Sequence, residues 1–221
     1  MSLAVTAASG QLGKLVLEHL LEDGVPARDI VAIARDRNKL SEFAERGVQV
    51  READYAEPAA LEAALRGVER LLLISTSGAG AADVRHANAI RAAEAAGAAH
   101  ILYTSIINAD HNVNPLAVEH LKTEKLLAAS TIPATILRNA YYYEVYTMRI
   151  PGYLATGKVL GATGHGPISG ALRDEFAIAA AKVLASNDVE PRILELGGPS
   201  YSLEEFAQAV NEVTGSNLIH E

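Results

Sequence analysis

The first 140 residues alternate between short apolar runs and amphipathic stretches. The apolar runs have the length and composition of strands, and they cover residues 3–6, 29–34, 48–51, 70–75, 100–104 and 134–137. Between them, apolar residues recur at helical spacing, which predicts helices over residues 11–22, 38–46, 58–66, 82–96 and 116–129. Because the strands are apolar throughout, the pattern predicts an α/β fold with a parallel sheet covered by helices on both faces.

After Asn139 the alternation changes. Tyrosines lead into a helical stretch that ends near Gly157, and a short strand is expected at residues 158–160. A turn-rich loop at 162–166, a helix over 173–185, a strand over 192–196 and a helix over 202–213 follow. Ser202 and Glu205 have the spacing of a capping box at the start of the last helix. We therefore expect a core over residues 1–140 and a small α/β lobe over residues 141–221, at the sheet edge where ligands bind in such folds.

The stretch V-T-A-A-S-G-Q-L-G, Val5 to Gly13, lies between the first strand and the first helix. A strand, a turn of small residues and a helix N-terminus are what a dinucleotide pyrophosphate requires, so the fold is predicted to be of the Rossmann, doubly wound type. Ala7 occupies the first glycine position of the usual G-x-x-G-x-x-G spacing. If the turn needs a positive φ at residue 7, alanine is strained there; if φ is negative, alanine fits.

Composition excludes several classes of protein. The formal net charge of −8 argues against a nucleic-acid surface, which needs a basic face. With no cysteine there is no disulfide framework, and no apolar run approaches the length that spans a membrane. The seven histidines are scattered without metal-ligand spacing, so no metal is expected. We interpret the chain as a cytoplasmic protein.

The residues after the second and third strands face the adenosine half of a dinucleotide in this fold. Arg35, helped by Lys39 one helical turn later, suits the 2′-phosphate of NADPH. Asp36 can instead cap the next helix or hold a ribose, and the second role would favour NADH. Asp54, followed by Tyr55, can accept the adenine amino group or act only as a turn residue.

Further polar residues follow the later strands. Ser75, Thr76 and Ser77 form a small polar loop over the middle of the cofactor, and Tyr103, Thr104 and Ser105 end the next strand at the same sheet edge. The tyrosines from 141 to 146 either pack in a core or face a flat aromatic substrate. Arg173 opens a helix and either faces the cleft or solvent.

Seven segments of the sequence, and the order in which they occur, resemble the NmrA-like atypical short-chain dehydrogenases. The resemblance covers essentially the whole chain. The segments are T-A-A-S-G-Q-L-G, I-V-A-I-A-R-D, A-D-Y, L-L-L-I-S-T-S, I-L-Y-T-S, E-H-L-K-T-E-K-L-L and T-I-L-R-N-A-Y-Y. Within that family the pattern is most similar to the type 2 NAD(P)H:quinone oxidoreductases, with triphenylmethane reductase a near relative. The resemblance implies a flavin-free reductase that binds NADPH and passes hydride to a quinone.

The resemblance also implies roles for particular residues. The phosphate loop would comprise Ala7, Ala8, Ser9, Gly10, Gln11 and Leu12, and Thr6 would also bind the cofactor. Arg35 would take the 2′-phosphate, residues 75–77 and 103–105 would flank the nicotinamide, and Asn139 with Tyr141, Tyr142 and Tyr143 would line the cleft. Relatives continue beyond Glu221, so part of the substrate lobe is expected to be absent, which affects catalysis and homodimer formation more than cofactor binding.

The Tyr-x-x-x-Lys pair of the wider superfamily corresponds here to Leu116 and His120, so the usual acid catalyst is missing. Reducing a quinone gives a phenolate-like anion whose conjugate acid has a pKa near ~10, as for tyrosine. That anion can take its proton from water or from a weak donor such as His120. Tyr103 is the second residue predicted to be catalytic. Two alternatives stay open: a dinucleotide-binding redox sensor that signals to a partner protein, and a reductase of another flat acceptor such as a triphenylmethane dye.

Overall fold

The computed structural model describes residues 1–76, 81–164 and 166–221, and the chain groups into two compact units. The first unit comprises Met1–Asn139 and Asp174–Glu195, and the second comprises Ala140–Arg173 and Leu196–Glu221. The sequence-based boundary differs in one segment. Residues 174–195, expected in the second lobe, group with the first unit because the strand that follows this helix joins the large sheet.

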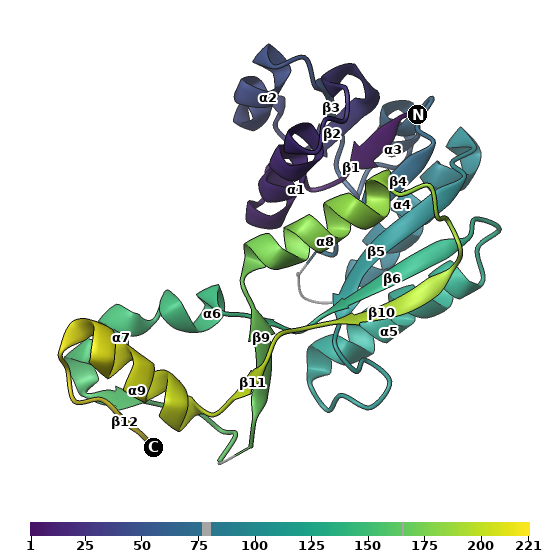
Figure 1. Ribbon diagram of the computed structural model, residues 1–221. Coiled ribbons are helices and arrows are strands. Elements are labelled where there is room, and N and C mark those ends of the chain that lie inside the picture. Colours follow the sequence, from purple (N-terminus) through teal and green to yellow (C-terminus); the bar gives the residue numbers. More distant parts are fainter. Residues whose placement is uncertain (77–80, 165) are drawn as a thin grey trace. The chain divides into compact units, whose positions relative to one another are not determined.

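A seven-stranded sheet forms the centre of the first unit (Figure 1). Its strands are β1 (Leu3–Val5), β2 (Ile30–Ala34), β3 (Gln49–Glu52), β4 (Arg70–Leu73), β5 (His100–Ile106), β6 (Ala134–Asn139) and β10 (Arg192–Leu196). The spatial order is β10-β6-β5-β4-β1-β2-β3, and β1 to β6 pair in parallel. The strand order reverses between β1 and β4, where ligands bind in open α/β sheets. The predicted Rossmann-type doubly wound sheet is confirmed.

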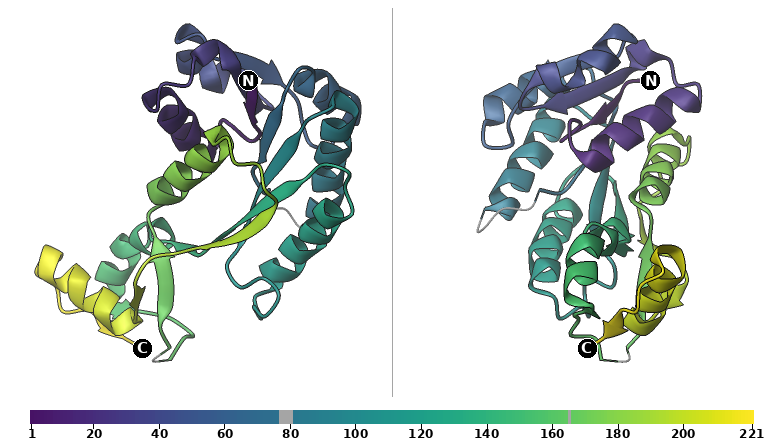
Figure 2. Two further views of the ribbon diagram at one scale, coloured as in Figure 1. Left: turned by 45° about the vertical axis from the view of Figure 1, so that its right-hand side comes forward. Right: turned by 90° about the vertical axis from the view of Figure 1, so that its left-hand side faces the viewer.

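Helices cover both faces of this sheet, with α1 and α8 on one side and α3, α4 and α5 on the other (Figures 1 and 2). They are α1 (Gln11–Glu22), α2 (Ser41–Glu45), α3 (Pro58–Leu65), α4 (Ala82–Ala96), α5 (Pro115–Ala128) and α8 (Arg173–Ala185), with 3-10 turns η1 (Ala27–Asp29) and η2 (Arg37–Leu40). The prediction of a single helix over 38–46 is wrong, because this segment divides into η2 and α2. The Asp36 carboxylate accepts from the N–H of Asn38 and caps the tight turn η2, which precedes α2.

The core lies between the sheet and its helices. Leu3, Ala4 and Val5 of β1 are completely buried, and so is Leu71 of β4. Burial of each large aliphatic side chain contributes about 1.5–3 kcal/mol. Of the helices in the described ranges, none has both the length and the apolar composition that a membrane span requires.

The second unit is made of short elements. They are β7 (Tyr141–Tyr142), α6 (Glu144–Thr147), α7 (Ile150–Thr156), β8 (Lys158–Val159), β9 (Ile168–Ala171), β11 (Ser200–Tyr201), α9 (Leu203–Thr214) and β12 (Ile219–His220). The capping box predicted at Ser202 and Glu205 is confirmed. The one helical stretch expected after Asn139 is instead a strand and two helices. Pro151 lies in the first turn of α7 and has no N–H to continue the hydrogen bonds of α6. The strands β9, β11 and β12 were not predicted, because each is very short and lacks the continuous apolar run that indicated a strand elsewhere in the chain.

Candidate cofactor site

The turn between β1 and α1 has the backbone that a bound phosphate requires. Ala7 has φ 48°, so the turn does need a positive φ at this position and alanine is the strained choice. The N–H of Gly10 donates to the Ala7 carbonyl at 2.9 Å, and a Cβ on Gly13 would lie only 2.7 Å from that oxygen. Gly13 therefore lets α1 approach the turn. Gly10 is the N-cap of α1 and has no side-chain cap, which leaves the first N–H groups of the helix for an anion.

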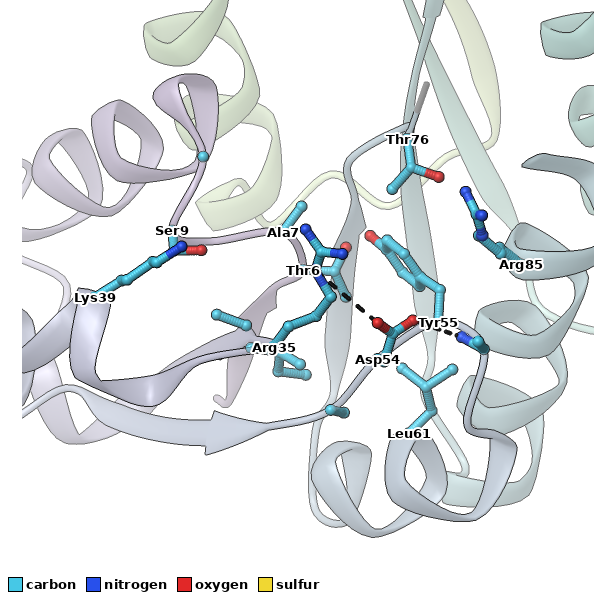
Figure 3. A pocket seen from close by; sticks show the side chains of 15 residues that line it. Thr6, Ala7, Ser9, Arg35, Lys39, Asp54, Tyr55, Leu61, Thr76 and Arg85 are labelled. Atoms are coloured by element: carbon cyan, nitrogen blue, oxygen red, sulfur yellow. Dashed lines mark hydrogen bonds and ion pairs between the residues drawn. The ribbon is translucent and has the colours of Figure 1, made fainter. Parts of the chain in front are cut away.

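A cavity of about 500 Å³ opens beside this turn, at the carboxyl ends of β1 to β4 (Figure 3). It brings together nine of the residues predicted to bind the cofactor: Thr6, Ala7, Ser9, Gly10, Arg35, Lys39, Asp54, Tyr55 and Thr76. The wall also contains residues that sequence reasoning did not select, namely Ile33, Ala34, Ala53, Ala56, Leu61 and Arg85. A turn of free N–H groups beside a cavity of this size fits a dinucleotide.

Two cations follow β2 at the cavity. The Arg35 side chain is 82% exposed, and its Nε lies 3.9 Å from Asp54, a distance at which an exposed pair is weak. Lys39 has no ion pair within the described ranges. One carboxylate oxygen of Asp54 accepts from the N–H of Ala56 at 2.8 Å, so Asp54 is a turn residue that still faces the cavity. Both cations are available to an anionic ligand.

Buried hydroxyl groups join the ends of β1, β4 and β5. Thr6 donates to the carbonyl of Leu72 and accepts from the N–H of Ile74. The Thr104 hydroxyl accepts from the N–H of Ser75 at 2.8 Å and lies 3.2 Å from the Ser75 hydroxyl. These bonds hold residues 74 and 75, which follow β4, against the ends of β1 and β5. The predicted Ser77 lies outside the described residues.

Next to Thr76, His86 of α4 organises a second polar group that the sequence did not reveal. The N–H of Thr76 donates to Nε2 of His86, which must therefore be the unprotonated nitrogen. Nδ1–H then donates to the Thr123 hydroxyl at 2.8 Å. Burial, together with the charge of His120, lowers the pKa of His86 to about 4. The ring is neutral at physiological pH and acts as a structural bridge.

The two candidate catalytic residues are hydrogen-bonded to each other. The Tyr103 hydroxyl lies 2.9 Å from Nδ1 of His120. Tyr103 is completely buried, and burial raises its pKa well above the usual range. Burial also lowers the pKa of His120. A neutral His120 that accepts the Tyr103 proton at Nδ1 carries its own proton on Nε2.

Several predicted residues do not line the cavity. The N–H of Ala8 donates to the Ile33 carbonyl, while Gln11 and Leu12 contribute the first residues of α1. Ser105 donates to Glu124 at 2.5 Å, on the network around the buried Arg138. Asn139 ends β6 and is buried.

The residues predicted to contact substrate belong to the second unit. The Tyr143 ring packs against Tyr201 with centroids 5.4 Å apart. Tyr142 lies beneath the Arg173 guanidinium at 5.2 Å, and Tyr141 is 39% exposed. The N–H of Arg173 donates to the Glu144 carboxylate. The ring contact with Tyr201 therefore gives Tyr143 a packing role within the second unit. Tyr141 is the most exposed of the three tyrosines 141 to 143.

The sheet order, the glycine turn and the cavity define the class of an NAD(P)-binding doubly wound protein. An NAD(P)H-binding family profile matches residues 7–166, and the chain belongs to this NAD(P)H-binding family. It is also 33% identical to an NmrA-like oxidoreductase of Aspergillus flavus, over 99% of this chain and 73% of that protein. The chain is 44% identical to quinone oxidoreductase 2 of Escherichia coli K12, over 99% of this chain and 77% of that protein.

Solved structures agree with this assignment. The crystal structure of the NADPH-dependent quinone oxidoreductase of E. coli complexed with NADPH superposes with a TM-score of 0.96 at 43% identity, covering 99% of this chain and 77% of that one. Triphenylmethane reductase of Citrobacter sp. superposes with a TM-score of 0.95 at 39% identity, covering 100% and 78%. Within the described residues there is no cluster of side chains that could hold a metal ion.

Proposed function

We propose that this protein is a flavin-free reductase that uses NADPH to reduce quinones. The observation that carries the cofactor assignment is the pair Arg35 and Lys39 at the edge of the cavity, without a strong acidic partner. Support for the quinone comes from the E. coli relative, which is named a quinone oxidoreductase. NADPH supplies a hydride from its nicotinamide when it is bound.

Each part of the site has one task in this proposal. The free N–H groups at the start of α1 hold the pyrophosphate, because the helix dipole favours an anion there. Arg35 and Lys39 hold the 2′-phosphate, which NADH lacks. Thr104 and His86 hold the main chain at Ser75 and Thr76, and in this proposal these two residues orient the nicotinamide.

The proton that completes quinone reduction needs only a weak donor. His120 fits this task through Nε2–H, and Tyr103 acts through His120 rather than on the substrate, because its ring is fully buried. Water is the other source, since the product anion has a pKa near ~10. Loss of His120 should therefore slow the reaction less than loss of cofactor positioning.

The test is the loss of NADPH absorbance on mixing the purified chain with benzoquinone, without added flavin. Arg35→Ala should raise KM for NADPH by about tenfold or more, the loss of a charged hydrogen bond, and change KM for NADH little. Arg37→Ala is the matched control, since Arg37 is an exposed cation two residues away that does not line the cavity. Equal behaviour of the two variants would contradict the 2′-phosphate assignment.

The likeness to triphenylmethane reductase favours a second acceptor class. A panel of quinones and triphenylmethane dyes, compared by kcat/KM at saturating NADPH, ranks the two. Quinones should rank first. Binding of NADPH without turnover of any acceptor would instead favour a redox sensor.

A further inference from the structure

Arg85 is a cation of the cavity wall to which no motif assigns a role. It lies in the first turns of α4 and lines the cavity with Thr76 and Tyr55. Figure 3 shows its side chain extending from α4 beside Tyr55 and Thr76, on the side of Tyr55 away from Arg35 and Lys39. Among the described residues, its guanidinium has no hydrogen bond or ion pair. Its donors are free for a ligand.

The position of Arg85 is fixed by its neighbours on α4. Asn88, three residues later and on the same helix face, donates to the Tyr55 carbonyl at 2.9 Å. The Tyr55 hydroxyl in turn donates to the Ile74 carbonyl at 2.9 Å. The turn after β3, the end of β4 and α4 are thus tied together, and Arg85 projects from a rigid support.

The surroundings of Arg85 suit a flat ring rather than a phosphate. Ala53, Ala56 and Leu61 supply an apolar wall on the β3 side of the same cavity. The phosphate groups already have partners elsewhere in the proposed function, at the start of α1 and at Arg35 and Lys39. A cavity lined by both a guanidinium and apolar side chains is a favourable setting for an aromatic heterocycle, because arginine stacks on aromatic faces.

We propose that Arg85 contacts the adenine ring of the bound dinucleotide and contributes to affinity for NADPH and NADH alike. This inference rests on the proposed function, since it assumes that the cavity binds a dinucleotide. It assigns Arg85 a task different from that of Arg35: Arg35 distinguishes the two cofactors, whereas Arg85 strengthens both.

Calorimetric titration of the full chain, without quinone, tests this assignment. Arg85→Ala should lower the affinities for NADPH and NADH by the same factor, about fivefold. The affinity for adenosine 5′-monophosphate should fall by the same factor, and the affinity for nicotinamide mononucleotide should not change. Arg37→Ala, which removes an equal charge away from the cavity, should leave all four affinities unchanged.

Arg85→Lys separates stacking from charge. Lysine keeps the positive charge but lacks the planar group, so its affinities should resemble those of Arg85→Ala. Full recovery by lysine, a loss confined to NADPH, or no loss in Arg85→Ala would each overturn the proposal. Thermal unfolding of each ligand-free variant verifies that it is folded, and lysine retains the aliphatic stem if alanine does not fold.

Failure of this inference is distinguishable from failure of the proposed function. If wild-type protein reduces benzoquinone with NADPH while Arg85→Ala binds normally, only the adenine contact is wrong. If the wild-type chain binds neither dinucleotide, both fail.

Discussion

Two neighbouring regions of the first unit hold their geometry by different means. The turn between β1 and α1 depends on the main chain: a positive φ at Ala7, an uncapped helix start and a glycine where a Cβ would collide. The region next to Ser75 and Thr76, at the end of β4, depends on buried neutral side chains, chief among them His86 and Tyr103.

The difference decides what the sequence reveals. Residues of the turn lie within nine consecutive positions, whereas partners of the second region lie far apart along the chain. Ser75 and Thr104 are 29 residues apart, His86 and Thr123 are 37 apart, and Tyr103 and His120 are 17 apart. A local motif records the first kind of geometry and cannot record the second.

The largest effect expected is that of Gly13→Ala, which tests the main-chain region. The added Cβ would lie 2.7 Å from the Ala7 carbonyl oxygen and from Cα of Ala8, and neither backbone atom can move without disturbing the turn. We expect the free energy of unfolding to fall by about 3 kcal/mol, with weaker NADPH binding. Urea unfolding and titration measure the two.

Gly152→Ala is the matched control, because Gly152 also lies in a helix, α7, but has open space where its Cβ would be. This variant should be neutral or more stable by about 0.5–1 kcal/mol. Similar losses in both variants would show that the turn is not tightly packed against α1.

The same distinction explains how far the fold and the site were predictable. Continuous apolar strands and helical spacing sufficed for the sheet and for most of its helices, although not for the segment 38–46, and the motif from Val5 to Gly13 located the cavity. The sequence did not reveal that Thr6 and Ser105 use their hydroxyls within the protein, because Leu72 and Glu124 lie at a distance. Arg85 was missed because one cation on an amphipathic helix is indistinguishable from a solvent-exposed one.

The second prediction concerns the buried side chains and depends on pH. The pKa of His86 is about 4 in the folded state, against 6.5 for an unperturbed histidine. Between these values the unfolded chain binds a proton that the folded chain does not, so the free energy of unfolding falls as pH is lowered through this window. At pH ~4.5 the loss should be about 2–3 kcal/mol relative to pH ~7.5. Urea unfolding of wild type and His86→Gln at several pH values measures this fall. The free energy of unfolding of the variant should fall less on acidification than that of wild type.

His19 supplies a control of opposite sign. Burial opposes its charge, but hydrogen bonds and charge from Asp174 and Glu22 raise its pKa, and Nε2 lies 2.6 Å from Asp174. Its contribution is present below the unfolded pKa and is lost as pH rises through the folded one. His19→Gln should therefore make the fall on acidification larger. Parallel pH curves for wild type and His86→Gln would show that His86 is not the buried neutral bridge.

The smallest effect expected returns to the main-chain region, at Ala7. Alanine at positive φ is strained by about 1 kcal/mol, and replacing it with glycine relieves that strain. Part of the relief is offset, because glycine is more flexible in the unfolded chain and loses more entropy on folding. Ala7→Gly should therefore stabilise the protein by about 0.5 kcal/mol and raise Tm by about 1–2 °C. Asn108 has φ 54°, and asparagine tolerates this region better, so Asn108→Gly should raise Tm less. Calorimetry of both variants measures the difference, and an equal rise would mean that Ala7 carries no special strain. If Ala7→Gly alone is stabilising, the turn keeps its shape because its surroundings impose it, and alanine is tolerated there at a small loss of stability.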